Sequence, residues 1–187
     1  MIARRTRILL CGVSLALPLA ACGHKQAHPH AGDSEGVYVD AGPVTYQVQL
    51  SRELSPYNVE DQQYLRGLPS GTLGPRPDEE WFAIFLWAKN QSRSPATTAS
   101  SFDIVDTQGT KYVPLAINPT VNPFAWTPQS LKPLGTEPSP DSVAAFGPTQ
   151  GSELLFKINT SAYSNRPLTL EIRGPAQQLW GSITLDL

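Results

Sequence analysis

The sequence predicts an all-β protein whose folded part is an antiparallel, immunoglobulin-like β-sandwich with two long loop insertions and one short helix. Three observations support this prediction. Apolar and polar residues alternate along several short segments, and a period of two is typical of strands. The 187 residues include 18 prolines and 14 glycines, which mark turns and interrupt long helices. When residues 1–39 and two stretches that lack a strand pattern are left out, the remaining length is close to the roughly 100 residues of an immunoglobulin-like domain.

The chain begins with a predicted export signal, residues 1–21. Three arginines precede the mostly apolar run Ile8–Ala21, which is shorter than the roughly 20 residues of a membrane-spanning helix. The run continues as Leu-Ala-Ala-Cys-Gly over residues 19–23, which is the order of a bacterial lipobox. Cleavage between Ala21 and Cys22 would leave a thiol that can carry acyl chains, and two or three such chains anchor a protein stably. We therefore expect Cys22 to hold the protein on a membrane lipid, with the domain outside the cytoplasm.

The composition after this cleavage excludes several classes of protein. Residues 1–21 contain three of the 14 Lys and Arg residues, none of the 16 Asp and Glu residues and one of the two cysteines, so the remainder has a net charge of −5. A single cysteine cannot pair within the chain. An acidic chain also lacks the basic footprint that nucleic-acid binding needs. Whether Arg4-Arg5 marks twin-arginine export or the general route stays open.

Residues 22–39 are predicted to be a flexible lipidated tether, and residues 40–187 the folded domain. Small, polar, Gly and Pro residues in this segment bury too little apolar surface to become ordered. All three histidines, His24, His28 and His30, lie in it and could share a zinc or copper ion. A metal-handling lipoprotein is therefore one alternative function. The simpler interpretation is a solvated linker, because no carboxylate or thiolate lies between the histidines, and no cofactor is expected.

Eight strands and one helix are predicted in the domain. The strands are Val44–Leu50, Trp81–Lys89, Phe102–Asp106, Lys111–Leu115, Val143–Phe146, Glu153–Ile158, Leu168–Ile172 and Leu179–Leu187. A short turn with Gly109 joins the third and fourth strands into a hairpin. Asn58–Arg66 is the helix, with Asn58 as its N-cap and Asp61 in its first turn. The stretches 52–79 and 117–142 have no strand pattern and are predicted to be insertions, which are usually functional or cover something when ordered.

The strand Trp81–Lys89 is apolar on both faces. Such a strand is covered on both sides or exposes an apolar patch that binds a partner. The insertions supply possible covers: Tyr57, Tyr64, Leu65, Leu68, Phe124 and Trp126. One interpretation is a second small core beneath the insertions. The other is a platform for an envelope protein or glycan, formed by Trp87, Phe124 and Trp126.

Catalytic chemistry has few candidates in this sequence. Residues 31–187 contain no histidine or cysteine, which excludes Ser-His-Asp and Cys-His sites and the usual zinc hydrolase sites. A carbohydrate-acting enzyme needs two carboxyl groups about 5–9.5 Å apart across a cleft. The candidate carboxylates are Asp78, Glu79 and Glu80, or Asp103 and Asp106. The simpler interpretations are a solvated charge run and a hairpin turn held by Asp106, so we expect no enzyme.

Three motifs in the domain resemble a known family. They are Asn90 after an apolar strand, the pattern Phe102-x-Ile104-x-Asp106-x-x-Gly109-x-x-Tyr112, and the run Glu153–Ile158. Together they resemble bacterial extracellular immunoglobulin-like lipoprotein domains over about residues 44–173. That family usually has a Pro-Gly turn before its Leu-x-Phe strand, where this chain has Phe-Gly-Pro-Thr-Gln-Gly at 146–151. This departure and the two insertions alter any shared binding surface.

The function that these observations predict is that of an anchored envelope lipoprotein. Its non-catalytic sandwich would bind or scaffold an unidentified envelope protein or glycan. The resemblance implies the same class, in which the function of most members is unassigned.

Overall fold

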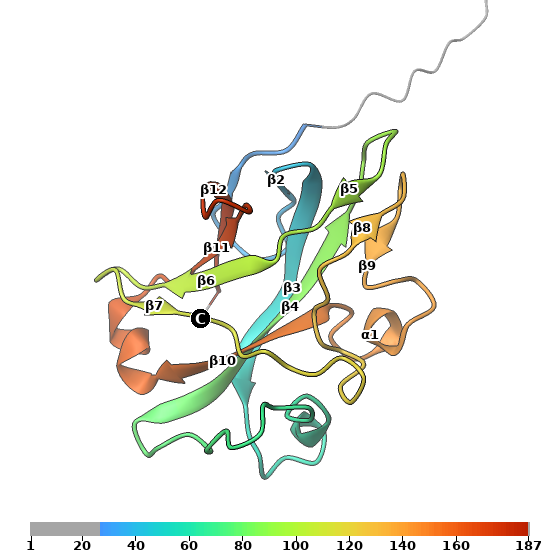
Figure 1. Ribbon diagram of the computed structural model, residues 1–187. Coiled ribbons are helices and arrows are strands. Elements are labelled where there is room, and N and C mark those ends of the chain that lie inside the picture. Colours follow the sequence, from blue (N-terminus) through green and yellow to red (C-terminus); the bar gives the residue numbers. More distant parts are fainter. Residues whose placement is uncertain (1–26, 187) are drawn as a thin grey trace, which may run out of the picture.

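The computed structural model describes residues 27–186, and its strands form the predicted sandwich (Figure 1). Sheet A has the strand order β1-β12-β11-β6-β7, and sheet B has the order β10-β4-β3-β2 with β9 beside β4. The strands of sheet A are β1 (Ala31–Gly32), β12 (Leu179–Thr184), β11 (Thr169–Arg173), β6 (Ser101–Val105) and β7 (Lys111–Tyr112). Those of sheet B are β10 (Ser152–Asn159), β4 (Glu79–Lys89), β3 (Val44–Leu54), β2 (Val39–Ala41) and β9 (Thr136–Glu137). All pairs are antiparallel except β1 with β12.

The remaining elements are short. A third sheet pairs β5 (Ala96–Thr97) with β8 (Ser130–Leu131). The helical pieces are η1 (Asp61–Gln63), α1 (Val143–Phe146) and η2 (Thr160–Asn165). None of the helices within residues 27–186 is long and apolar enough to cross a membrane.

The main core lies between sheets A and B. Alternate residues of β4, namely Phe82, Ile84 and Leu86, face the partner sheet and are fully buried. Sheet A contributes Phe102, Ile104, Leu170, Ile172 and Ile183 to the same cluster. The buried Tyr46 hydroxyl accepts a hydrogen bond from the Ala99 N–H at 2.6 Å, so the one polar atom of that ring is satisfied.

A second core covers part of the outer face of sheet B. The sequence predicts such a cover as one alternative, because β4 is apolar on both faces. Trp81, Ala83 and Phe85 project from β4 into it and are buried. The insertions supply Tyr64 and Phe124, whose rings meet edge to face at 4.9 Å. The interpretation of the insertions as a cover is therefore confirmed for this half of β4.

Asn122, which is completely buried, joins the two insertions to sheet B. Its Nδ2 donates to the Tyr64 carbonyl at 2.9 Å and to Glu153 Oε2 of β10 at 3.0 Å. Its Oδ1 accepts from the Phe124 N–H at 2.9 Å. One amide thus links the first insertion, the second insertion and the edge strand of the sheet.

Two predicted elements are wrong. Val143–Phe146 forms α1 and not a strand, because the Ser142 hydroxyl caps it by accepting from the Ala145 N–H at 3.3 Å. The predicted helix Asn58–Arg66 shrinks to the 3₁₀ turn η1. Asp61 lies in the first turn of η1 as predicted, and it also pairs with Arg52 Nη2 at 2.5 Å and accepts from the Ser55 N–H at 2.8 Å. Burial alone would raise the pKa of Asp61, but these bonds outweigh it and lower the pKa.

Three strand boundaries also differ from the prediction. β3 continues to Leu54, so the first insertion begins later than residue 52. β7 ends at Tyr112 and not at residue 115. β12 ends at Thr184, and Leu187 lies outside the described residues. The hairpin between β6 and β7 is confirmed, with Gly109 at φ +81° in its turn.

The predicted boundary between tether and domain, at residues 39 and 40, is also wrong. Residues 27–39 belong to the domain, because β1 adds to sheet A beside β12 and the Gly36 N–H donates to the Val48 carbonyl at 2.9 Å. Residues 27–36 contain few apolar side chains, but backbone hydrogen bonds to an exposed sheet edge order them, and Val39 is buried in the main core. Residues 22–26 of the predicted tether lie outside the described residues.

Candidate functional site

The second core covers only half of the outer face of sheet B. Successive outward residues of β4 are buried as far as Phe85, whereas Trp87 is half-buried. Beyond Phe85 the insertions no longer cover the sheet. The last outward aromatic residue of the strand therefore lies where the cover ends.

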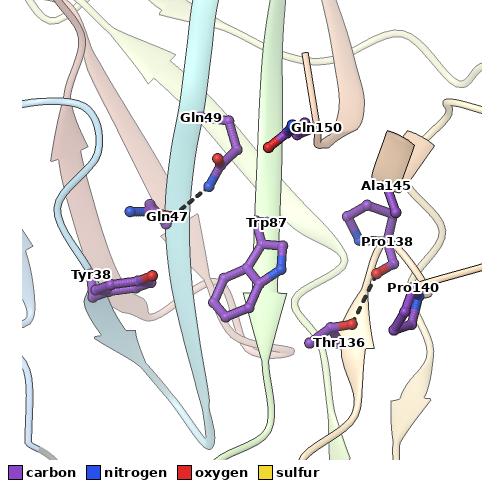
Figure 2. Close-up of a pocket in the computed structure, with 9 residues that line it drawn as sticks. All are labelled: Tyr38, Gln47, Gln49, Trp87, Thr136, Pro138, Pro140, Ala145 and Gln150. Carbon is purple, nitrogen blue, oxygen red and sulfur yellow. Dashed lines mark hydrogen bonds between the residues drawn. The ribbon is translucent and has the colours of Figure 1, made fainter. Parts of the chain in front are cut away.

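Trp87 lines an open groove with a volume of about 400 Å³ (Figure 2). The lining residues are Tyr38, Gln47, Gln49, Trp87, Thr136, Pro138, Pro140, Ala145 and Gln150. They come from five separate segments of the sequence. Figure 2 shows the indole of Trp87 in the middle of the groove, between Tyr38 on one side and Thr136 on the other.

Strand register brings the floor of this groove together. Gln47 of β3 lies directly opposite Trp87 of β4, so both side chains share the outer face. The register of β3 shifts between Val48 and Leu50, which marks a β-bulge at Gln49. Bulges re-aim a side chain, and here Gln49 also lines the groove. The Tyr38 ring meets the Trp87 ring edge-on at 5.8 Å.

The opposite wall depends on a close approach of the chain to β4. A Cβ atom at Gly151 would lie only 2.8 Å from the carbonyl carbon of Phe85, so glycine is required at this position. The preceding residue, Gln150, has φ +49° and lines the groove. This is the segment in which the sequence departs from the Pro-Gly turn of the lipoprotein family.

The groove presents aromatic rings and neutral amides, and no charged side chain lines it. Gln49 donates to the Gln47 amide oxygen, and Gln47 donates to the Gly36 carbonyl at 2.5 Å. These bonds fix two amides beside the Trp87 ring. Such a surface can stack an apolar face of a ligand on the indole and exchange hydrogen bonds with hydroxyl or amide groups.

The structure does not bring the three predicted platform residues together. Phe124 is 7% exposed and belongs to the second core. Trp126 packs on the main core, 5.4 Å from the Phe102 ring, and its Nε1 donates to the Ala99 carbonyl at 3.1 Å. Of the three, only Trp87 lines the groove of Figure 2, whereas Trp126 and Phe124 line two other, separate hollows of the surface. The sequence analysis missed Tyr38, Gln47 and Gln49, although the polar side of the alternation in Val44–Leu50 was a signal for the two glutamines.

The carboxylate candidates at 78–80 lie at the start of β4, away from the groove. Arg76 contacts Asp78 at 3.6 Å and Glu79 at 2.9 Å. Glu80 lies beside Tyr163 and Glu53, and burial together with the Glu53 charge raises its pKa. These groups do not line the groove around Trp87.

The second carboxylate pair has structural partners. Asp106 accepts from the N–H groups of Gln108 at 2.9 Å and Thr110 at 2.8 Å, which is the predicted hairpin role. Burial alone would raise its pKa, but these bonds and one from Asn165 lower it. Asp103 instead pairs with Arg173 Nε at 2.7 Å on sheet A.

Two of the three histidines meet at one aspartate. His28 Nδ1 lies 3.3 Å from Asp40 Oδ1, and His30 Nδ1 lies 2.5 Å from the Asp40 carbonyl oxygen. Among residues 27–186, no group of three or more His, Cys, Asp or Glu side chains is placed to hold a metal ion. His24, and the lipidation and cleavage residues Ala21 and Cys22, lie outside the described residues.

Comparisons with known proteins support the fold and give no information on function. No family model matches the chain, and no curated protein is similar to it in sequence. The yjhA protein from Bacillus subtilis is similar in structure, with a TM-score of 0.50 at 9% identity over 82% of this chain and 99% of that chain. An uncharacterized β-sandwich protein from Clostridium difficile 630 gives a TM-score of 0.41 at 12% identity over 87% of this chain and 97% of that chain. At 9% identity the first likeness shows the fold alone.

Proposed function

We propose that this chain is a lipoprotein of the bacterial cell envelope whose non-catalytic β-sandwich binds an envelope partner through the groove at Trp87. The anchor rests on the sequence, where a basic segment and an apolar run lead to Leu-Ala-Ala-Cys-Gly at 19–23. The binding role rests on one structural observation. Trp87 is the outward aromatic residue of β4 that the insertions leave accessible, in a groove lined by three glutamines.

The chemistry of the groove favours an uncharged, hydroxyl-rich ligand, and an envelope glycan matches it. A sugar ring has an apolar C–H face that can stack on the indole and hydroxyl groups that can bond to the glutamine amides. A ligand with many charges would gain little here, because the lining has no charged group to pair with it.

The anchor is tested by metabolic labelling with radioactive palmitate. The wild-type chain should carry label in cells, and the Cys22→Ala variant should carry none and remain an uncleaved precursor or become soluble. Label on the Cys22→Ala variant would show that the lipobox interpretation is wrong.

The groove is tested by photo-crosslinking in the native envelope. A photoreactive residue at position 49 should capture a glycan adduct, and Trp87→Ala should abolish that adduct. The matched control places the photoreactive residue at Tyr57, which is 92% exposed and outside the groove. The same adducts from both positions, or an adduct that survives Trp87→Ala, would contradict the proposal.

A further inference from the structure

Three loops meet at the end of the sandwich where the described chain begins. Figure 1 shows the first described residues, the β2–β3 turn and the loops around β5 and β8 at the same end of the sandwich. We call this the basic end and define it by Lys89, the last residue of β4, and by the loop residues 42–43, 90–95 and 131–135. Buried Asn90 joins two of these loops, since its Nδ2 donates to the carbonyl oxygens of Ser94 at 2.8 Å and Leu131 at 3.0 Å.

Hydrogen bonds also connect the start of the described chain to this end. The His28 N–H donates to Asp40 Oδ2 at 3.1 Å, and the Thr45 hydroxyl donates to Asp40 Oδ1 at 2.5 Å. Gln91 Nε2 donates to the Thr45 hydroxyl oxygen at 3.1 Å. The chain thus enters the domain next to the loop 90–95.

The basic end carries cations without anionic partners. Arg93 and Lys132 are exposed and Lys89 is half-buried, and none of the three forms an ion pair within residues 27–186. The three loops contain no Asp or Glu. Two carboxyl groups lie near this end, Asp40 and Glu137, and each residue is only 6% exposed.

Acidic residues gather at the other end of the same strands. Glu53 lies near the end of β3, and Asp78, Glu79 and Glu80 lie where β4 begins. The 11 residues of β4 span about 35 Å, which is several Debye lengths at physiological salt. Arg76 pairs with Asp78 and Glu79 and Arg52 precedes Glu53, so this end keeps a smaller negative excess, whereas the cations of the basic end have no such partners among the described residues.

Chain length brings the basic end close to the proposed anchor. Ala27, the first described residue, follows Cys22 by five positions. Five extended residues span at most about 18 Å. An acylated Cys22 therefore holds this end of the domain near the lipid headgroups.

We propose that the basic end lies against the bilayer surface and that Lys89, Arg93 and Lys132 bind anionic lipid headgroups. This inference rests on the anchor in the proposed function. Leu134, which is 69% exposed in the same loop as Lys132, adds an apolar contact at the headgroup boundary. The acidic end then points away from the negative surface.

The test uses the chain from Cys22 to Leu187, whose single cysteine is coupled to a maleimide that carries one C14 acyl chain. One such chain gives only marginal membrane binding, with an association constant of about 10⁴ M⁻¹, so added contacts are measurable. Partitioning is compared between phosphatidylcholine vesicles and vesicles with 30% phosphatidylglycerol. Each cation near an anionic surface adds about fivefold, so we expect about 10²-fold stronger partitioning on the anionic vesicles, which 0.5 M NaCl reverses.

Two triple variants separate this surface from net charge. Lys89→Gln, Arg93→Gln and Lys132→Gln together should remove the preference for anionic vesicles. The matched control combines Arg66→Gln, Arg76→Gln and Arg166→Gln, which change the net charge equally at exposed sites outside the basic end. This control variant should keep most of the preference for anionic vesicles. Thermal melts confirm that both variants fold.

Equal partitioning of the wild-type chain on both vesicles, or equal losses in both triple variants, would overturn the proposal. In the first case the basic end would be available to an acidic protein partner instead. Because the acyl chain is attached chemically, this result does not depend on natural lipidation. Palmitate labelling in cells tests the anchor separately.

Discussion

At the scale of single residues, Glu153 is the carboxyl group with the least ordinary surroundings. The residue is 1% exposed, with Oε2 bonded to Asn122 and Oε1 without a hydrogen-bond partner. Burial raises its pKa from 4.5 to about 8, and the Asn122 bond and the Arg52 charge offset only part of that effect. Glu153 is therefore largely protonated at neutral pH in the folded protein.

This pKa predicts how stability depends on pH. Between about pH 4.5 and 8 the unfolded chain loses the Glu153 proton and the folded chain keeps it. The contribution of this group is thus fully present below pH 4.5 and is lost as pH rises through 8. Urea unfolding should show Glu153→Gln gaining stability relative to the wild type as pH increases, by several kcal/mol at about 1.4 kcal/mol per pKa unit. Glu171→Gln on sheet A is the control, and parallel curves for Glu153→Gln and wild type would contradict this assignment.

Two aromatic neighbours on one face of β4 should behave differently. Phe85 is completely buried in the second core, whereas Trp87 is half-buried in the groove. Phe85→Ala should lower the free energy of unfolding by about 3–5 kcal/mol, and Trp87→Ala by only about 1 kcal/mol. Thermal melts of both variants beside wild type make the comparison. Alternation alone could not separate them, because it places both residues on the same face and does not show where the cover ends.

At the scale of elements, the sequence located the long strands well. β4, β6, β10 and β11 begin and end within two residues of the predicted bounds, because the alternation in β6, β10 and β11 and the continuous apolar run in β4 extend over at least five residues. Val143–Phe146 was misassigned since four residues do not separate a strand from one turn of helix. The helix predicted at Asn58–Arg66 is only the 3₁₀ turn η1, and Asp61 in its first turn is bound to Arg52, a residue outside the predicted segment.

The groove could be predicted only in part. The sequence indicated Trp87 as an aromatic residue on a strand that is apolar on both faces. The other residues that line the groove come from segments far away in the sequence. Tyr38 lies in a segment that composition assigns to a tether, and Gln49 lines the groove at a β-bulge that alternation does not reveal. Trp126 was assigned to the platform because its hydrogen bond to Ala99, which holds it on the main core, is not visible in the sequence.

The link between the insertions and sheet B predicts a large effect at Asn122. Asn122→Ala removes the bonds to the Tyr64 carbonyl and to Glu153, which leaves buried acceptors without donors. Each such group costs about 1–3 kcal/mol, so we expect a loss of about 3 kcal/mol or more in urea unfolding. Asn118→Ala, at an exposed asparagine of the same insertion, is the matched control and should change stability little. Similar losses in both variants would show that Asn122 does not join these elements.

At the scale of the whole molecule, the groove and the basic end lie in the same half of the domain. Trp87 is two residues from Lys89, and Tyr38 packs against His28 with ring centroids 5.5 Å apart. Under the proposed anchoring, a ligand in the groove would be held beside the membrane, not far out in the envelope. The insertions and the second core then stabilise the half that points away from the bilayer.

The last prediction concerns residues 27–36. Deleting a flexible tether leaves a domain unchanged, whereas deleting a strand of a sheet destabilises it. β1 supplies the outer neighbour of β12, with Ala31 opposite Ser182 and Gly32 opposite Ile183. The Glu35 carboxylate also accepts from the Ser51 N–H at 3.1 Å. A chain that begins at Val37 loses these bonds and exposes the edge of β12.

At roughly 0.5–1.5 kcal/mol per hydrogen bond, and after the chain entropy that deletion recovers, we expect the chain from Val37 to be about 2–3 kcal/mol less stable than the chain from Ala27. Urea unfolding measures this difference. Amide exchange should also become faster in β12, and the free edge should promote association through strand pairing. Deleting a flexible tether would leave the free energy of unfolding, amide exchange in β12 and association unchanged. Equal stability of the two chains together with unchanged exchange in β12 would therefore show that residues 27–36 do not form part of the domain.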